Sequence, residues 1–192
     1  MINTKKLDWK KVWINNGSKN SSDLKVLNGH DKTSINSEYV VQNITELFDI
    51  ISDTKVLEVG CGAGMLAQHF KCSYVGVDYS HTLIDKHKKI LGNEVYVCEA
   101  NELIFEDCEF DFCFSYSIFQ YFPNYDYMKQ TISEMIRVSK RGVFIGDIPL
   151  DSHEENHLLF NKNDFDGWIT TDSFYKHETS NRFNAYKKYE ME

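Results

Sequence analysis

VLEVGCGAG, residues 56–64, is the stretch that decides the fold of this 192-residue chain. An apolar, β-rich run enters a loop that carries glycine at every second position. Glycine lets a backbone turn tightly and approach a ligand closely, and the N–H groups that follow such a turn are free to face that ligand. A GxGxG pattern is weak evidence when it stands alone. Its neighbours therefore decide what it means.

An acidic residue at the right distance strengthens the pattern. Asp78 lies 18 residues beyond Gly60, at the end of the next predicted strand, residues 73–78. A carboxylate in that place accepts hydrogen bonds from both hydroxyls of a ribose. The alternative, a glycine turn followed by an unrelated surface aspartate, stays open.

Strands and helices alternate along the chain. Predicted strands cover residues 55–59, 73–78, 94–98, 110–115 and 143–148. Predicted helices cover residues 38–51, 65–70 and 125–139, and Gly142 ends the last of these. A further predicted helix begins after Ser80, which caps it. Two further strands, 173–177 and 182–189, read as an antiparallel hairpin. The expected fold class is α/β: a doubly wound, mostly parallel Rossmann-like sheet with a C-terminal antiparallel hairpin, and ligands at the carboxyl ends of its strands.

The N-terminal segment stands apart from this alternation. Trp9, Val12 and Trp13 recur at helical spacing, and a polar loop at 15–23 follows them. The two tryptophans are either core residues or part of a lid. We expect residues 1–35 to form a lid or appendage and residues 36–192 to form the main domain.

The composition narrows the class of partner. With 42% hydrophobic residues, the chain can bury one good core. Its net charge of −8 repels nucleic acids and anionic membranes, which favours a small or cationic partner. Neither a leader nor a membrane-length apolar run is apparent, so a cytoplasmic protein is expected, as a monomer or homodimer. Five cysteines without CxxC spacing read as reduced core residues, and the bias for Lys over Arg suggests a bacterial source.

From about residue 38 to 146 the chain resembles the class I S-adenosylmethionine-dependent methyltransferases. The resemblance rests on VLEVGCGAG, on Asp78 and its neighbours, and on FDFCFSYSIFQYFP at 110–123. It implies S-adenosylmethionine as the cofactor. The residues it assigns to the methionine end are Glu58, Gly60, Cys61, Gly62 and Gly64. It assigns Asp78 to the ribose. It assigns Tyr79, Glu99 and Ala100 to the adenine, and the Ser115 backbone to the amino group.

The acceptor side is less explicit. Many members of this family carry a histidine pair after the fourth strand, where this chain has Gln120-Tyr121. The candidate bases are Tyr121, His153 and Asp147, in no order, because loops after these strands reach the ligand edge of the sheet. Packing for Tyr121 and a solvated helix cap for His153 stay open. The expected reaction is O- or N-methylation of a small molecule, such as a sugar or a phosphorylated metabolite.

A formal zinc motif occurs at residues 153–157, which read HEENH. Two histidines one helical turn apart and a glutamate form the HExxH pattern of zinc proteases. The segment follows Pro149, has no evident third ligand, and falls where the acceptor loop is expected. No metal is therefore expected.

Two other functions stay open. The first is a non-catalytic S-adenosylmethionine-binding module of a larger assembly, which the missing histidine pair would allow. The second is an NAD-dependent Rossmann oxidoreductase. GxGxG in place of GxGxxG, and a hairpin in place of a sixth parallel strand, disfavour it.

Overall fold

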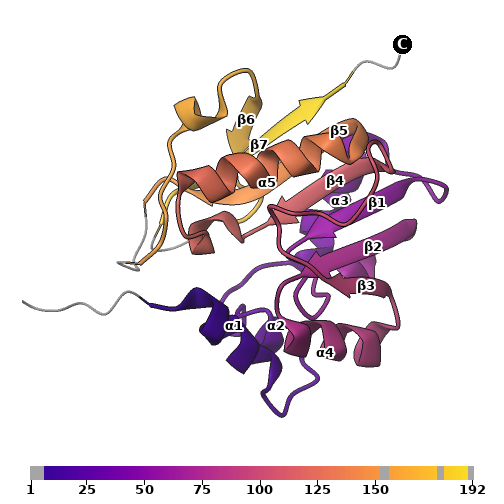
Figure 1. The fold of residues 1–192 in the computed structure, drawn as a ribbon, viewed down its shortest axis with the longest axis vertical. Coiled ribbons are helices and arrows are strands. Elements are labelled where there is room, and N and C mark those ends of the chain that lie inside the picture. The colour runs from indigo at the N-terminus through magenta and orange to yellow at the C-terminus, as the bar shows by residue number, and fades with distance from the viewer. Residues whose placement is uncertain (1–6, 152–155, 177–179, 190–192) are drawn as a thin grey trace, which may run out of the picture.

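A single twisted sheet organises the chain. The computed structural model describes residues 7–151, 156–176 and 180–189 (Figure 1). Within these ranges seven strands form one sheet in the order β3-β2-β1-β4-β5-β7-β6. The strands are β1 (Lys55–Val59), β2 (Ser73–Asp78), β3 (Glu94–Val97), β4 (Phe110–Tyr116), β5 (Ser139–Pro149), β6 (Ile169–Asp172) and β7 (Arg182–Lys188). The helices are α1 (Trp9–Gly17), α2 (Leu24–Leu27), α3 (Ser37–Phe48), α4 (His81–Leu91) and α5 (Tyr125–Arg137).

The pairing of the strands confirms the predicted fold class. β1 runs parallel to β2 and β4, and the parallel run continues to β3 on one side and β5 on the other. β7 pairs antiparallel with both β5 and β6. The strand order reverses between β1 and β4, which is where such sheets leave a crevice at their carboxyl ends.

The first strand of the hairpin was predicted at 173–177, and this was wrong, because β6 ends at Asp172. Ser173 instead donates a hydrogen bond from its hydroxyl to Asp147. The ring of Phe174 stacks on Phe144 at a centroid distance of 5.5 Å. The segment leaves the sheet edge because its apolar residues pack over the sheet face.

Two apolar layers bury the sheet. Leu57 and Val59 of β1 face the side covered by α5, whereas Val56 faces the side covered by α3 (Figure 1). Phe48 of α3 packs on Phe112 of β4 at 4.7 Å between ring centroids. Burial on both faces explains why the central strands are continuously apolar, as expected for a parallel sheet.

Two predicted local features differ in the structure. The helix expected at 65–70 is only the short 3-10 helix η1 (Ala67–His69), because the five residues between the positive-φ Gly64 and the extended Phe70 are too few to nucleate an α-helix. Gly142 does not end α5; it lies inside β5, where an added Cβ would be 2.5 Å from the carbonyl oxygen of Lys187. Gly142 allows β5 and β7 to approach each other closely.

All five cysteines are free, as expected, but the prediction that all are core residues was wrong for Cys108, which is exposed. It lies in a left-handed turn with φ of 53°, before β4 begins. In the described ranges no helix has both the length and the apolar character that crossing a bilayer requires.

The N-terminal helix packs against the start of α4. The Thr82 hydroxyl donates to the carbonyl oxygen of Ile14 at 2.7 Å, and the Ser80 hydroxyl donates to that of Trp13 at 3.3 Å. Gly17 permits this approach, since an added Cβ would lie 2.3 Å from Thr82 Oγ1. These contacts fix α1 beside α4, next to the carboxyl edge of β2 (Figure 1).

Substitution of Gly142 tests the close contact between β5 and β7. We expect Gly142→Ala to lower the free energy of unfolding by about 1–3 kcal/mol, because the methyl group displaces the backbone of β7. Urea unfolding measures this, with Lys140→Ala, an exposed site on the same strand, as the control. Equal stability of the two variants would contradict the account of Gly142.

Candidate cofactor and active site

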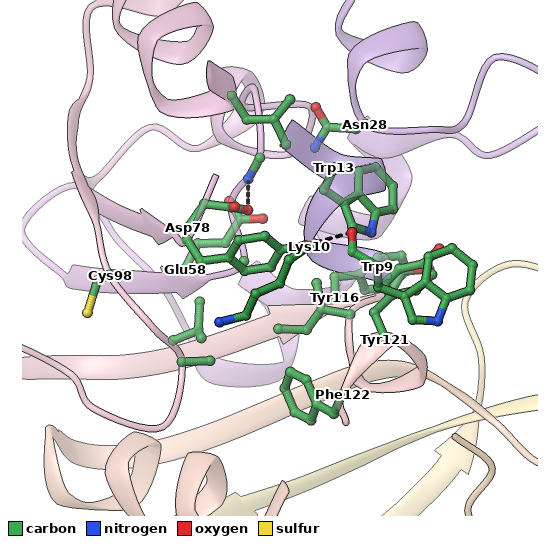
Figure 2. A pocket seen from close by; sticks show the side chains of 18 of the residues that line it. Trp9, Lys10, Trp13, Asn28, Glu58, Asp78, Cys98, Tyr116, Tyr121 and Phe122 are labelled. Atoms are coloured by element: carbon green, nitrogen blue, oxygen red, sulfur yellow. Dashed lines mark hydrogen bonds between the residues drawn. The ribbon is translucent and has the colours of Figure 1, made fainter. Parts of the chain in front are cut away.

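A cavity of about 310 Å³ opens at the carboxyl ends of β1, β2 and β4. That volume lies at the lower end of the range for small-molecule sites. Its walls come from the strand ends, the segment at 116–123, and the N-terminal helices. Figure 2 shows Trp9 and Trp13 of α1 across the cavity from Glu58 and Asp78.

The glycine loop satisfies its own backbone. Every N–H group from Gly60 to Gly64 donates to an oxygen atom of the protein. The pairs are Gly60 and Cys61 to the Val77 carbonyl (2.8 and 3.0 Å), Gly62 to Asp78 Oδ2 (3.0 Å), Ala63 to Asn28 Oδ1 (3.1 Å) and Gly64 to the Cys61 carbonyl (3.0 Å). A phosphate would need such N–H groups unpaired. This loop has none to offer.

Glycine is required where the loop meets the fourth strand. Gly60 has a φ of 79°, and a Cβ there would lie 2.6 Å from the side chain of Ile118. Ile118 follows Ser117, which itself has a φ of 57°. Strained non-glycine residues of this kind concentrate at functional sites. The two segments thus meet closely at the cavity.

Two buried carboxyl groups lie beneath the loop. Burial raises the pKa of Glu58 to about 8, although a 2.5 Å hydrogen bond from the Tyr74 hydroxyl opposes the shift. Burial also raises the pKa of Asp78 to about 6, while the N–H groups of Ser80 and Gly62 lower it. Both side chains line the cavity. Bringing a cation into it would favour their ionised forms.

The opposite wall is aromatic. The Tyr121 ring lies 4.7 Å from that of Trp9 and 5.1 Å from that of Trp13, measured between centroids. His157 packs on Trp9 at 5.1 Å and on Tyr121 at 5.5 Å. The Trp9 indole N–H donates to the carbonyl oxygen of Asn156 at 3.1 Å. Helix α1 is therefore tied to the segment after β5 as well as to α4.

A polar contact joins α1 to the end of β3. Lys10 forms an ion pair with Glu99, and the Tyr127 hydroxyl donates to the same carboxylate at 2.9 Å. The Tyr79 hydroxyl donates to the Trp9 carbonyl oxygen at 3.2 Å. Lys10, Tyr79 and Tyr127 all line the cavity. Helix α1 thus covers one side of it.

Seven of the residues predicted from the sequence lie together. The residues that line the cavity are Glu58, Gly60, Gly62, Asp78, Tyr79, Ala100 and Tyr121. Four of the others sit close by without lining it. They are Cys61 and Gly64, within the loop, Glu99, which contacts the lining residues Lys10 and Tyr127, and Ser115, whose neighbours Tyr116 and Ser117 take its place in the wall.

Asp147 is placed elsewhere. Its carboxylate is buried against Arg182, 3.2 Å from a guanidinium nitrogen, and it does not line the cavity. Its φ of 61° turns β5 at this point. A charge paired in this way serves the junction of β5 and β7, so the predicted reach to the ligand edge is not found.

The remaining predicted base, His153, lies outside the described residues, as do Glu154 and Glu155 of the HExxH pattern. Within the described ranges, no three His, Cys, Asp or Glu side chains gather closely enough to hold a metal ion.

Several lining residues were missed from the sequence. Asn28 and Lys10 come from the N-terminal segment, Ser117 lies within the fourth-strand motif at 110–123, and Tyr127 follows that motif. Asn28, Lys10 and Tyr127 belong to no recognisable motif. The polar stretch after Trp13 gave no sign that Asn28 would reach the glycine loop. Only the three-dimensional path of the chain brings it there.

Comparison with known proteins identifies the domain. The family model described as "Methyltransferase domain" matches residues 57–145. The tRNA (carboxymethyluridine(34)-5-O)-methyltransferase of Arabidopsis thaliana is 33% identical over 112 residues, covering 58% of this chain and 28% of that protein. An uncharacterized protein of Methanocaldococcus jannaschii is 36% identical over 98 residues, covering 50% of this chain and 45% of that protein. The chain thus spans less than half the length of these relatives.

A solved structure agrees with the fold. Magnesium protoporphyrin IX methyltransferase from Synechocystis PCC 6803, with bound S-adenosylmethionine, superposes with a TM-score of 0.62. The match covers 96% of this chain and 99% of that one at 14% identity. The resemblance read from VLEVGCGAG is confirmed. Residues 57–145 match the methyltransferase domain, and the chain shares the fold of that solved methyltransferase.

Proposed function

We propose that this chain binds S-adenosylmethionine in the cavity beneath α1 and transfers its methyl group to a small-molecule acceptor. One observation carries the proposal: two buried carboxyl groups lie beneath a glycine loop whose N–H groups are all used internally. Such a site suits a positively charged nucleoside and not a pyrophosphate. The matched methyltransferase domain supports the same conclusion.

The residues of the cavity fit the parts of this cofactor. Glu58 and the loop from Gly60 through Cys61 and Gly62 to Gly64 would hold the methionine end. Asp78 would hold the ribose. The adenine would lie among Tyr79, Ala100 and Tyr127, with Glu99 nearby, and the Ser115–Ser117 backbone would approach the amino group. S-adenosylmethionine supplies an electrophilic methyl group, so the protein chiefly orients the acceptor and excludes water.

An NAD-dependent oxidoreductase fits this site poorly. A dinucleotide pyrophosphate is held by free N–H groups at the start of a helix. Here the five N–H groups of the loop are already bonded, and the segment that follows is a three-residue 3-10 helix. We therefore do not retain this alternative.

The acceptor is proposed to be uncharged or cationic. Apart from His30, the only basic side chain lining the cavity among the described residues is Lys10, and Lys10 is paired with Glu99. The wall formed by Trp9, Trp13 and Tyr121 suits a flat or cationic group. Among the described lining residues only His30 and the already paired Lys10 are basic, so the site suits a phosphorylated metabolite, one of the acceptors expected from the sequence, less well.

Tyr121 is our candidate for contact with the acceptor, because it lines the cavity and packs within the aromatic wall. Asp147 lies outside that wall, against Arg182. His153 remains a prediction. Residues 1–35 would supply the cover, through α1, while residues 36–192 would form the methyltransferase domain.

A tRNA acceptor deserves a direct test, because one relative is named for tRNA methylation. The net charge of −8 favours a small molecule over a nucleic acid. A cytoplasmic location and a monomeric or homodimeric state remain predictions from the sequence.

Cofactor binding is expected to release a proton. The folded pKa of Glu58 lies near 8, above its ordinary 4.5, so ionisation of Glu58 is disfavoured in the free protein. The stability of the fold therefore falls as the pH rises from 4.5 to 8. A bound sulfonium favours the ionised form. The affinity for S-adenosylmethionine should therefore rise between pH 6 and 8, by at most about tenfold per pH unit for one proton.

Calorimetry in buffers of different ionisation enthalpy measures this proton release. Glu58→Gln removes the titrating group and should flatten the pH dependence. Proton uptake on binding, or affinity that falls with pH, would be inconsistent with buried carboxyl groups as the cation site.

Turnover tests the proposed reaction. We would incubate the chain with S-adenosylmethionine and, in separate arms, a phenol, an aromatic amine, an alkylamine, a sugar phosphate and total tRNA, and measure S-adenosylhomocysteine. We expect product in an uncharged or amine arm. Binding of the cofactor with no turnover in any arm would instead support a non-catalytic module. Turnover only with tRNA would replace the proposed acceptor class.

With an accepted substrate, Tyr121→Phe should lower kcat by about tenfold or more if its hydroxyl orients the acceptor through a hydrogen bond. Affinity for S-adenosylhomocysteine should change little, since the ring remains. Tyr125→Phe is the matched control, because that exposed hydroxyl bonds to Leu159 outside the cavity. Wild-type kcat in Tyr121→Phe would remove Tyr121 from the reaction.

A further inference from the structure

Asn28 bonds the glycine loop through its side-chain carboxamide. Its side-chain oxygen accepts a hydrogen bond from the Ala63 N–H at 3.1 Å, and its side-chain nitrogen lies 3.5 Å from the Cys61 carbonyl oxygen that it bonds. An added Cβ on Gly62 would lie 2.4 Å from that nitrogen. The carboxamide therefore lies directly against the turn, on the residue between its two partners.

Only a carboxamide fits both partners. The loop presents one N–H donor and one carbonyl acceptor to the same side chain, and Asn carries an acceptor and a donor on one planar group. A carboxylate would place a second acceptor against the Cys61 carbonyl. An apolar side chain would leave both backbone groups to water or to the ligand.

The backbone of Asn28 is itself held in place. It caps α2, with its N–H donating to the Leu24 carbonyl oxygen at 3.0 Å, and Leu24 and Leu27 are buried. The next residue, Gly29, has a φ of 72° and passes so close to Trp13 that an added Cβ would lie 2.8 Å from its ring. Asn28 is thus fixed between the core and the aromatic wall.

Asp78 bonds the loop from the other side. Its carboxylate accepts the Gly62 N–H at 3.0 Å, so adjacent N–H groups, those of Gly62 and Ala63, are held by side chains from two separate segments. Asn28 and Asp78 both line the cavity (Figure 2). The loop conformation at the cavity therefore depends on both.

We propose that Asn28 is a positioning residue for the cofactor, holding the Cys61–Ala63 turn in the shape that receives the methionine end. The inference rests on the proposed function. It makes the N-terminal segment part of the cofactor site, because Asn28, the C-cap of α2, supplies a hydrogen-bond partner to the loop, while α1 covers the cavity.

Calorimetry with two ligands isolates this role. S-adenosylhomocysteine carries the amino-acid end, whereas 5′-methylthioadenosine carries only the nucleoside and its thioether. Loss of two hydrogen bonds to the loop should raise the Kd of Asn28→Ala for S-adenosylhomocysteine by about tenfold or more. The Kd for 5′-methylthioadenosine should change by less than about twofold, since that ligand does not reach the turn.

Asn43→Ala is the matched control, because the Asn43 carboxamide bonds to the Tyr39 carbonyl on α3, away from the cavity. Its affinities for both ligands should equal those of the wild type. The backbone of Asn28 has a φ of −90°, which alanine adopts freely, so a folded variant is expected, and its unfolding temperature is measured in parallel.

The outcomes separate the two claims. If the wild type binds S-adenosylhomocysteine and Asn28→Ala binds it equally well, the positioning role is wrong while the proposed function stands. An equal loss for both ligands, or a collapse in unfolding temperature, would reduce Asn28 to a general structural residue and overturn the inference. If the wild type binds neither ligand, the proposed function fails and the inference falls with it.

Discussion

The closure of the loop at residues 60–64 by its own protein partners is the constraint on which the site depends. Backbone N–H groups that are buried without a partner destabilise a fold, and here oxygen atoms of a strand, a carboxylate, a carboxamide and the loop's own Cys61 carbonyl pair each of them. The N–H groups of the loop are thereby unavailable to a phosphate. What it presents to the cavity is its glycine surface, with Glu58 and Asp78 below it.

The charges and the cover follow from this closure. Because Asp78 bonds the loop and also ends β2, its carboxylate is buried, and its pKa rises to about 6. Burial raises the pKa of the nearby Glu58 further, to about 8. Opposite these groups, α1 contributes Trp9 and Trp13, held at the start of α4 and at the segment after β5. An acidic floor and an aromatic wall together favour a cationic ligand.

The sequence predicted the parts of this arrangement that local patterns encode. Hydrophobic periodicity and the glycine stretch were enough for the parallel sheet, and spacing was enough to place Asp78 beside the loop. The segment at 65–70 was misjudged because a helical pattern too short to nucleate looks the same in sequence as a longer one. Asn28 and Lys10 could not be predicted, since their contacts with the loop and with Glu99 span long stretches of chain. Asp147 was proposed from its position after a strand, and that position gives no sign that Arg182 lies beside it.

The central claim is that this cavity takes a positively charged nucleoside and excludes a pyrophosphate. Competitive titration of the wild-type chain tests it directly, with S-adenosylmethionine as the first ligand and NAD or ADP-ribose as the competitor. The account predicts saturable binding of S-adenosylmethionine that neither NAD nor ADP-ribose displaces at a hundredfold excess. A hundredfold excess corresponds to a difference in binding free energy of roughly 3 kcal/mol. Binding of NAD that displaces S-adenosylmethionine, or that occurs in its place, would contradict it.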